Sequence, residues 1–399
     1  MNQPGLSGAA WAGAAGADAA GADTARPEAA RPARAVIDLQ ALRHNYVQAR
    51  RQHGARVLAV LKADAYGHGA TACAGALQGL ADGYAVAFLD EARPLRQAGV
   101  AGPILVLEGA FSLEETVQAA RLGCALVVHD HAQLGMLQAA ERLGGPPVHV
   151  WLKIDTGMSR AGLPPGQAGQ AHARLRALRC VAGITLMTHL ASADEPASGQ
   201  TAAQLACFDE ATAGLPGPRS VANSAGILAW PGARRDWGRA GIMLYGAEPL
   251  PQPRAGLRPV MRLCSRVFAE RTVPAGQPVG YGAGYVAPRP TRLGLVAMGY
   301  ADGYPRRAPS GTPVAVDGRP AALAGRVSMD MLTVDLTDLP GCGVGSEVEL
   351  WGAAVPVGAV AQAAGTIPYE LLCNVKRVRR IYEGQDAPCA PAARRLQNA

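Results

Sequence analysis

Lysine is nearly absent from this sequence of 399 residues: only Lys62, Lys153 and Lys376 occur, and the other 35 of the 38 basic residues are arginine. Arginine keeps its proton in proteins, whereas a lysine amine can lose its proton and attack an aldehyde. In a chain that carries its surface charge on arginine, each remaining lysine is a candidate for amine chemistry, with chance retention as the alternative.

Further absences argue against whole classes of protein. No apolar run of about 18 residues occurs, so no membrane span is expected. The eight cysteines include no CxxC pair, which argues against a zinc ribbon and a disulfide scaffold and favours a reducing cytoplasm. The net charge of +7 is spread along the chain. Its one basic cluster, at residues 376–380, alternates with apolar residues, so a partly exposed strand explains it more simply than nucleic-acid binding does.

Composition divides the chain into four segments. Residues 1–33 are rich in Ala, Gly and Pro without periodicity, so we expect a disordered extension that is not a secretory signal. Residues 34–255 contain short apolar runs separated by amphipathic stretches such as 112–123 and 131–145. Residues 256–383 contain short alternating segments between Gly and Pro turns, which predict a mostly antiparallel β domain. Residues 384–399 are expected to form a flexible tail.

The apolar runs predict the architecture of the larger segment. Eight strand–helix repeats in about 190 residues favour a parallel (β/α)8 barrel, with a doubly wound open sheet as the lesser alternative. A further strand expected at 34–39 precedes the barrel and is a candidate member of the β domain. The eight runs lie at residues 57–61, 84–88, 103–107, 125–128, 148–154, 181–188, 219–222 and 240–244.

Active sites of such barrels form at the carboxyl ends of the strands. Polar residues follow most of the runs, which places Lys62 at the rim of the barrel. Desolvation there would lower the pKa of its amine and favour Schiff-base chemistry with an aldehyde. The polar residues at the strand ends are Lys62, Glu108, His129, Lys153, Asp155, Arg160, His189, Asn223, Ser224 and Arg239, with Gly241 and Ile242.

The loops ANSAG and RAGI, after the last two runs, place small residues and backbone N–H groups where barrels commonly hold phosphate. Tyr66 could reach the same phosphate or only begin a helix, and Ser224 could be only an N-cap. Arg239 is too weak a proton donor to protonate a pyridine nitrogen, and His189 could be a core histidine. These residues alone predict a Schiff-base or phosphate-binding enzyme and go no further.

Motifs of the β domain extend this pattern. GYGAGY at 280–285 resembles a dinucleotide-binding loop, but no helix is expected after it, so we reject that match. Tyr281, between two glycines of this motif, could stand exposed at an interface or belong to a structural hairpin.

Taken together, the motifs resemble those of the alanine racemase family, enzymes that use pyridoxal phosphate (PLP) and combine a barrel with a β domain. The resemblance spans residues 34–383, and its one small departure is RAGI where many members have RPGI. Nine motifs occur in family order: AVLKADAYGHG, LKIDTGMSRAGL, THLASADE, ANSAG, RAGIMLYG, PVGYGAGY, GYADGYPR, GRVSMDM and TIPYELLC.

The resemblance implies two catalytic bases. Lys62 would hold PLP covalently and move the α-proton on the D-alanine side, and Tyr281 from the second subunit of a homodimer would serve L-alanine. Racemisation needs bases on both faces of a planar carbanion, which is why two residues are required. His189 would bond to Arg239, and Arg239 would meet the pyridine nitrogen.

The remaining implied roles concern binding. Arg160 and the backbone of Met329 would bind the substrate carboxylate, and Lys153 matches a position that is carbamylated in many members. Tyr300 and Tyr369 would narrow the entrance in favour of a methyl side chain. The implied phosphate contacts are Tyr66, Ser224, Gly241, Ile242 and Tyr369, with Asn223 close by.

We therefore predict a cytoplasmic, homodimeric alanine racemase that supplies D-alanine for peptidoglycan and binds neither nucleic acid nor a membrane. One alternative is a broad-specificity amino-acid racemase of the same architecture. Another is a non-catalytic PLP-binding protein, which would need Lys62 but neither a second base nor the β domain. The sequence does not distinguish a biosynthetic from a catabolic role.

Overall fold

The computed structural model describes residues 31–252 and 256–384. The predictions for residues 1–30 and 385–399 lie outside the described residues. Eight parallel strands form a closed barrel, with β2 hydrogen-bonded to both β3 and β9. This confirms the predicted (β/α)8 barrel rather than an open sheet. The barrel strands are β2 (Arg56–Val60), β3 (Gly83–Val86), β4 (Ile104–Val106), β5 (Cys124–Val128), β6 (Val148–Lys153), β7 (Val181–Met187), β8 (Arg219–Ser220) and β9 (Trp237–Ala240).

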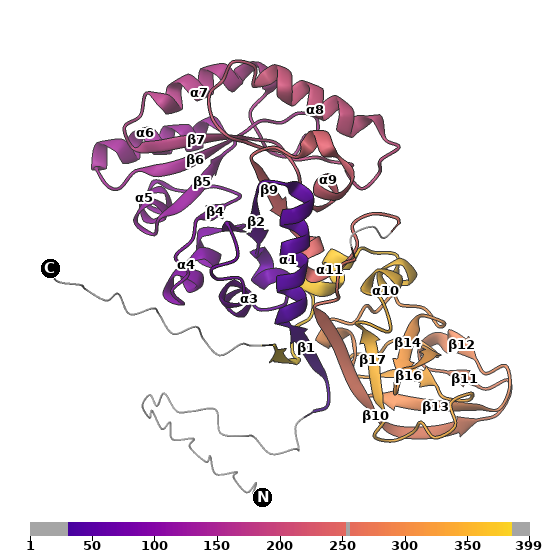
Figure 1. Cartoon of the computed structure of the whole chain (residues 1–399). Helices are drawn as coiled ribbons and strands as arrows, with labels where there is room; N and C mark the ends of the chain where they lie inside the picture. The colour runs from indigo at the N-terminus through magenta and orange to yellow at the C-terminus, as the bar shows by residue number, and fades with distance from the viewer. Residues whose placement is uncertain (1–30, 253–255, 385–399) are drawn as a thin grey trace, which may run out of the picture. The chain divides into compact units, whose positions relative to one another are not determined.

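Helices alternate with these strands and cover the outside of the barrel (Figure 1). Two of them coincide with the amphipathic stretches expected from the sequence: α5 begins after the N-cap Ser112, whose hydroxyl accepts a bond from Glu115 N, and α6 begins after the N-cap Asp130. The helices of this part are α1 (Leu39–His53), α2 (Lys62–Tyr66), α3 (Ala70–Ala76), α4 (Leu89–Gln97), α5 (Leu113–Arg121), α6 (His131–Leu143), α7 (Ala168–Arg176), α8 (Gly199–Ala211) and α9 (Ser224–Ala229).

The last barrel strand differs from the prediction at 240–244. Strand β9 ends at Ala240, and Ile242–Tyr245 forms a buried 3-10 turn. The backbone of Gly241 (φ −108°, ψ −102°) leaves the strand conformation and separates the two elements. A short apolar run has the same composition in a buried strand and in a buried turn, which is why its pattern indicated the wrong element.

The second part is a mostly antiparallel sheet, as predicted. Strand β1 joins this sheet, where it pairs antiparallel with β10 and parallel with β18. The strands are β1 (Arg34–Asp38), β10 (Met261–Val273), β13 (Thr291–Val296), β14 (Pro313–Val316), β15 (Arg319–Ala322), β16 (Leu332–Asp335), β17 (Glu347–Trp351) and β18 (Arg379–Glu383), with a separate hairpin of β11 (Pro278–Val279) and β12 (Tyr285–Val286). Helices α10 (Val357–Ala364) and α11 (Pro368–Cys373) follow β17.

Candidate active site

A cavity of about 580 Å³ opens at the carboxyl ends of the barrel strands. Four cationic side chains and two carboxylates line it, so the cavity is suited to an anionic ligand. Twelve residues singled out in the sequence line this cavity: Lys62, Tyr66, Glu108, Lys153, Arg160, His189, Asn223, Ser224, Arg239, Gly241, Ile242 and Tyr369.

Lys62 is presented by an unusual backbone. It follows β2 after one residue, Leu61, and the residues after it, Ala63 to Tyr66, all have φ between 50° and 55°. Such left-handed conformations are costly for residues that have a Cβ. Side-chain contacts help to hold the turn: the Ala63 N–H donates to Glu91 Oε1 at 2.7 Å, Asp64 Oδ1 accepts a bond from Ala70 N at 2.8 Å, and Asp64 Oδ2 pairs with Arg380 at 2.6 Å. The strained turn fixes the lysine at the rim of the cavity.

Tyr66, Ser224 and Gly241 meet at one corner of the cavity. Ser224 Oγ accepts bonds from Gly241 N at 2.9 Å and from Met243 N at 3.4 Å, so its hydroxyl hydrogen is free to donate. A Cβ at position 241 would lie 2.8 Å from the Tyr66 hydroxyl, so a larger residue there would displace the Tyr66 side chain. The N-cap of α9 is Asn223, whose Oδ1 accepts a bond from Gly226 N, so the capping alternative considered for Ser224 is wrong.

Arg239 lies on β9 and is 4% exposed. Its guanidinium donates to Ser220 Oγ at 2.6 Å and to the carbonyl oxygens of Thr188 at 2.8 Å and Val221 at 3.1 Å. Its Nη2 also lies 3.3 Å from His189 Nδ1. Burial lowers the pKa of Arg239 to about 10, so it stays charged at neutral pH. Burial and the neighbouring Arg239 charge hold the pKa of His189 well below its usual range, so His189 is a neutral acceptor.

Lys153 ends β6 on the opposite wall and is 7% exposed. Burial lowers the pKa of its amine to about 8, and the nearby Glu108 carboxylate opposes this shift. Arg160 follows a turn in which Asp155 Oδ1 accepts bonds from three successive backbone N–H groups, each at 3.0 Å. This turn brings the exposed Arg160 back to the cavity.

Three of the predicted site residues do not line the cavity of their own chain. Tyr281 lies in the β11–β12 hairpin and is 64% exposed, with the Arg306 guanidinium carbon 6.0 Å from its ring centroid. Tyr300 and Met329 lie together in the β domain, where Ala301 N donates to Met329 O at 2.9 Å and Tyr300 N donates to Ser328 O at 3.0 Å. The fold of one chain therefore brings the barrel residues together and leaves this second group exposed.

Sequence reasoning missed the residues that hold the site in shape. Gln204 on α8 donates to the carbonyl oxygen of His189 at 2.9 Å and accepts from Ala191 N at 2.8 Å, which fixes the loop after β7. A buried glutamine inside a helix gives no distinctive pattern in the sequence. Asp194 and Cys373 also line the cavity. They are contained in the THLASADE and TIPYELLC motifs but had been assigned no role.

Comparison with known proteins confirms the resemblance. Family models of the alanine racemase N-terminal and C-terminal domains match residues 37–249 and 260–382. The chain is 61% identical over 352 residues to an alanine racemase of Azoarcus sp. (strain BH72), which covers 88% of this chain and 99% of that protein.

Solved structures agree with this result. The biosynthetic alanine racemase from Pseudomonas aeruginosa matches with a TM-score of 0.86 and 48% identity, over 89% of this chain and 100% of that chain. The alanine racemase from Bartonella henselae, solved with covalently bound pyridoxal phosphate, matches with a TM-score of 0.82 and 31% identity, over 88% of this chain and 100% of that chain. The chain described here belongs to the alanine racemase family.

Proposed function

We propose that this protein is a PLP-dependent racemase that interconverts L-alanine and D-alanine, with Lys62 and Tyr281 as its two bases. One observation carries the proposal: the amine of Lys62 shares a cavity with the anion-binding corner at Ser224 and Gly241 and with the buried Arg239. Amine, phosphate donors and a ring-nitrogen partner are the groups that PLP requires.

The residues fit the cofactor. The Tyr66 and Ser224 hydroxyls can donate to its phosphate, because the Tyr66 hydroxyl has no hydrogen-bond partner among the described residues and Ser224 Oγ uses only its lone pairs. Gly241 leaves room for the phosphate oxygens. When bound, PLP would supply an electron-withdrawing ring that acidifies the α-hydrogen of the amino acid.

Arg239 would hold the ring nitrogen unprotonated. A guanidinium donates a hydrogen bond but does not release its proton in proteins. Its remaining hydrogen bonds, to Ser220, Thr188 and Val221, prevent it from turning away. Neutral His189 accepts from the same guanidinium and so adds no second positive charge.

Proton transfer would use Lys62 Nζ on one face of the substrate and the Tyr281 phenol on the other. Tyr281 does not line the cavity of its own chain, so we propose a homodimer in which the second subunit supplies this residue. The 64% exposure of Tyr281 at a hairpin tip supports the proposal, because an exposed side chain is free to enter a neighbouring site.

Substrate binding would use Arg160 and the backbone of Met329 for the carboxylate. Lys153 would be carbamylated and would orient Arg160, and its burial and lowered pKa favour the unprotonated amine that this modification needs. Tyr369, which lines the cavity, would narrow the entrance together with Tyr300 and select for a methyl side chain. The physiological role would be to supply D-alanine for peptidoglycan in the cytoplasm. Within the described ranges, the helices are too short or too polar to cross a membrane.

The experiment is a chiral assay of the holoenzyme with L-alanine and, separately, L-serine, L-lysine and L-arginine. Rapid formation of D-alanine with little of the other D-enantiomers supports the proposal, and comparable conversion of lysine or arginine favours a broad-specificity racemase. In parallel, Tyr281→Phe should lower the rate of racemisation by a factor of about 10³ while PLP stays bound. Full activity of this variant would exclude Tyr281 as a base, and no D-product from the wild type would indicate a PLP-binding protein without racemase activity.

A further inference from the structure

His68 is a fully buried histidine that follows the left-handed turn after Lys62, and it does not line the catalytic cavity. Its ring Nδ1 lies 2.9 Å from the carbonyl oxygens of both Ala65 and Tyr66. Carbonyl oxygens only accept hydrogen bonds, and burial lowers the pKa of the ring to about 4, so the neutral ring carries its proton on Nδ1. The Nδ1–H of His68 therefore donates to the last two residues of the turn.

The two halves of the turn are held by different side chains. The contacts of Ala63 with Glu91 and of the Asp64 carboxylate with its neighbours hold the first half. The second half, Ala65 and Tyr66, receives a side-chain hydrogen bond from His68. Because carbonyl oxygens buried in protein need a donor, this bond favours the left-handed backbone over alternatives that turn the two carbonyl groups away.

The His68 ring also belongs to a buried group of packed rings. It stacks on Tyr245, with ring centroids 4.5 Å apart and planes at 28°, and Tyr66 packs against the same tyrosine at 4.8 Å. The Tyr245 hydroxyl donates at 2.7 Å to the carbonyl oxygen of Val60, the last residue of β2. The backbone is thus held on both sides of Lys62, at Val60 before it and at Tyr66 after it, by one set of packed rings.

Two glycines flank His68 because its segment lies very close to other parts of the chain. A Cβ at position 67 would lie 2.2 Å from the Leu372 carbonyl oxygen on α11, and a Cβ at position 69 would lie 2.0 Å from the Tyr382 hydroxyl on β18. Both glycines also have positive φ, 81° and 93°, which other residues rarely adopt. A backbone fixed on both sides therefore presents the His68 ring to the two carbonyl oxygens.

We propose that His68 is a positioning residue for the amine of Lys62: its Nδ1–H holds the left-handed turn in the shape that directs Lys62 into the cavity and keeps the Tyr66 hydroxyl beside Gly241. His68 acts through the turn and does not line the cavity itself. The inference rests on the proposed function, in which Lys62 and Tyr66 hold PLP. Without the Nδ1–H, two buried carbonyl oxygens lose a donor, and a shift of the turn to recover one would displace the amine. A displacement of about 1 Å is enough to reduce a rate by about 10².

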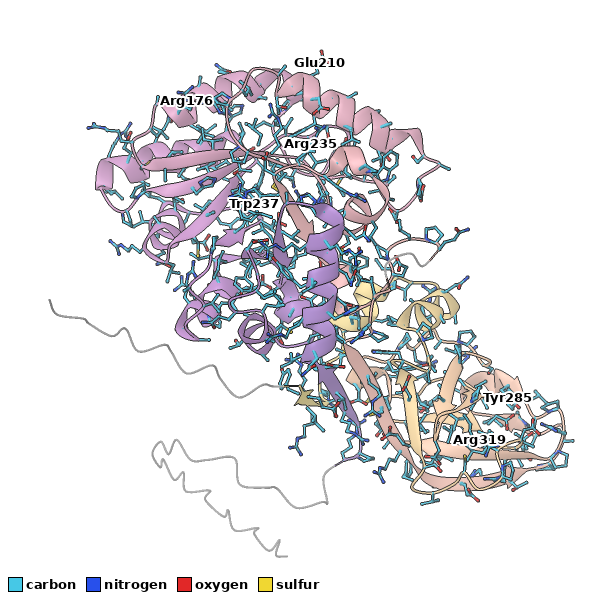
Figure 2. All side chains as sticks on the ribbon, in the orientation of Figure 1. Arg176, Glu210, Arg235, Trp237, Tyr285 and Arg319 are labelled. Atoms are coloured by element: carbon cyan, nitrogen blue, oxygen red, sulfur yellow. The ribbon has the colours of Figure 1, made fainter. Side chains whose placement is uncertain are left out.

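Three variants of the full-length enzyme separate the N–H donor from the ring. His68→Phe keeps a ring and removes the donor. His68→Asn removes the ring and keeps a donor, because its amide nitrogen is bonded to Cγ as the ring Nδ1 is. The matched control is His172→Phe, since His172 is also buried and its Nε2 lies 2.9 Å from the Pro216 carbonyl oxygen, but it lies on α7 outside the catalytic cavity. Figure 2 labels Arg176, the last residue of that helix, on the outside of the barrel.

The measurements are kcat and KM for L-alanine, the Kd for PLP by absorbance titration, and urea unfolding. In His68→Phe, kcat should fall and the Kd for PLP should rise, each by about tenfold or more. KM for L-alanine should change by less than about threefold, because the separate turn at Asp155 holds Arg160. His68→Asn should stay within about threefold of wild type in kcat and Kd. His172→Phe should keep wild-type kcat and Kd even where it lowers the free energy of unfolding.

Wild-type kcat and PLP affinity in His68→Phe would overturn the inference. Equal losses in His68→Asn and His68→Phe would also overturn it, because they would assign the effect to the ring. Equal losses in His172→Phe would assign the effect to general destabilisation. If His68→Phe does not fold, His68→Asn decides alone: retained kcat and PLP affinity support the role of the donor, and losses of about tenfold contradict it. If the wild type makes no D-alanine, the proposed function fails, and the PLP affinities still decide whether His68 positions the turn.

Discussion

Burial shifts the pKa values of two cationic side chains of the catalytic cavity, Arg239 and Lys153, with different consequences for their charge. Burial lowers the pKa of Arg239 to about 10 and that of Lys153 to about 8. At pH 7, Arg239 is therefore charged, whereas a larger share of the Lys153 amine is unprotonated than in an exposed lysine. Arg239 is thus a permanent hydrogen-bond donor, whereas Lys153 carries an amine that can react.

The lowered pKa of Lys153 predicts a carbamate. Incubation with ¹³C-labelled bicarbonate should give one carbamate resonance in the ¹³C spectrum of the holoenzyme, because carbon dioxide adds only to an unprotonated amine. Lys153→Gln should remove this resonance, and Lys376→Gln, the matched change at an exposed lysine of the β domain, should keep it. A resonance that survives in Lys153→Gln would assign the reactive amine elsewhere.

A substitution at Gly241 tests whether the corner formed by Tyr66, Ser224 and Gly241 holds the phosphate of PLP. In Gly241→Ala, the added Cβ would meet the Tyr66 hydroxyl at 2.8 Å, so the ring must move away from the phosphate position. We expect affinity for PLP, measured by absorbance titration of the apoenzyme, to fall by about tenfold, the loss of roughly one hydrogen bond to a charged group. Gly358→Ala is the control, because a Cβ there meets no atom within 4 Å. Wild-type affinity in Gly241→Ala would show that this corner does not hold phosphate.

At the scale of elements, the left-handed turn after Lys62 is the costliest backbone of the barrel site. Each non-glycine residue in this conformation costs roughly 1–2 kcal/mol, and the cost is larger for a β-branched side chain. The closed barrel and the bonds to Glu91 and Asp64 hold the turn. The element thus stores strain beside the reactive lysine, as functional sites often do.

Paired substitutions at the exposed Ala63 measure this strain. Ala63→Val should lower the free energy of unfolding by about 1–2 kcal/mol, whereas Ala63→Gly should keep it or raise it by up to about 1 kcal/mol, because glycine adopts this conformation without a steric penalty. Urea unfolding of the two variants gives both values. If valine is tolerated as well as glycine, the backbone of this turn is not left-handed in solution.

At the scale of the whole molecule, buried histidines link stability to pH. Burial lowers the pKa of His68 from 6.5 to about 4, and burial also lowers the pKa values of His53, His149 and His189. Below pH 6.5, the unfolded chain binds protons that the folded chain does not. Stability is therefore highest above pH 6.5 and is lost as the pH falls towards the folded-state pKa values.

For His68 alone, the free energy of unfolding should fall by about 3 kcal/mol between pH 6.5 and pH 4. His68→Phe keeps the ring beside Tyr245, whose centroid is 4.5 Å away, and should reduce the pH slope of the unfolding free energy by about one proton. Leu42→Ala, which destabilises the core without removing a titrating group, should keep the wild-type slope. An unchanged slope in His68→Phe would mean that this histidine is not buried in the neutral form.

Complementation tests whether two subunits share each site. A chain with Lys62→Ala and a chain with Tyr281→Phe should both be inactive alone. In a mixed dimer with shared sites, one site carries both lesions and the other is intact, so random mixing should restore about a quarter of wild-type activity. Recovery that stays at the background level would show that each chain provides both bases for its own site.

The sequence by itself determined the barrel, the antiparallel domain and the polar residues at the strand ends, because periodicity and turn residues are local properties that precede packing. Lys62 stood out by composition alone, and the family was identifiable from nine ordered motifs. These features needed no knowledge of which residues touch.

Tertiary structure decided what depends on contacts between distant segments. The pattern at 240–244 did not reveal that β9 ends at Ala240, since burial and not sequence period makes the next residues a turn. Support of the His189 loop by Gln204 and the neutral state of His189 arise only when elements pack. The same holds for Trp151 and Trp237, which are far apart in sequence but whose ring centroids lie 5.9 Å apart because the barrel closes.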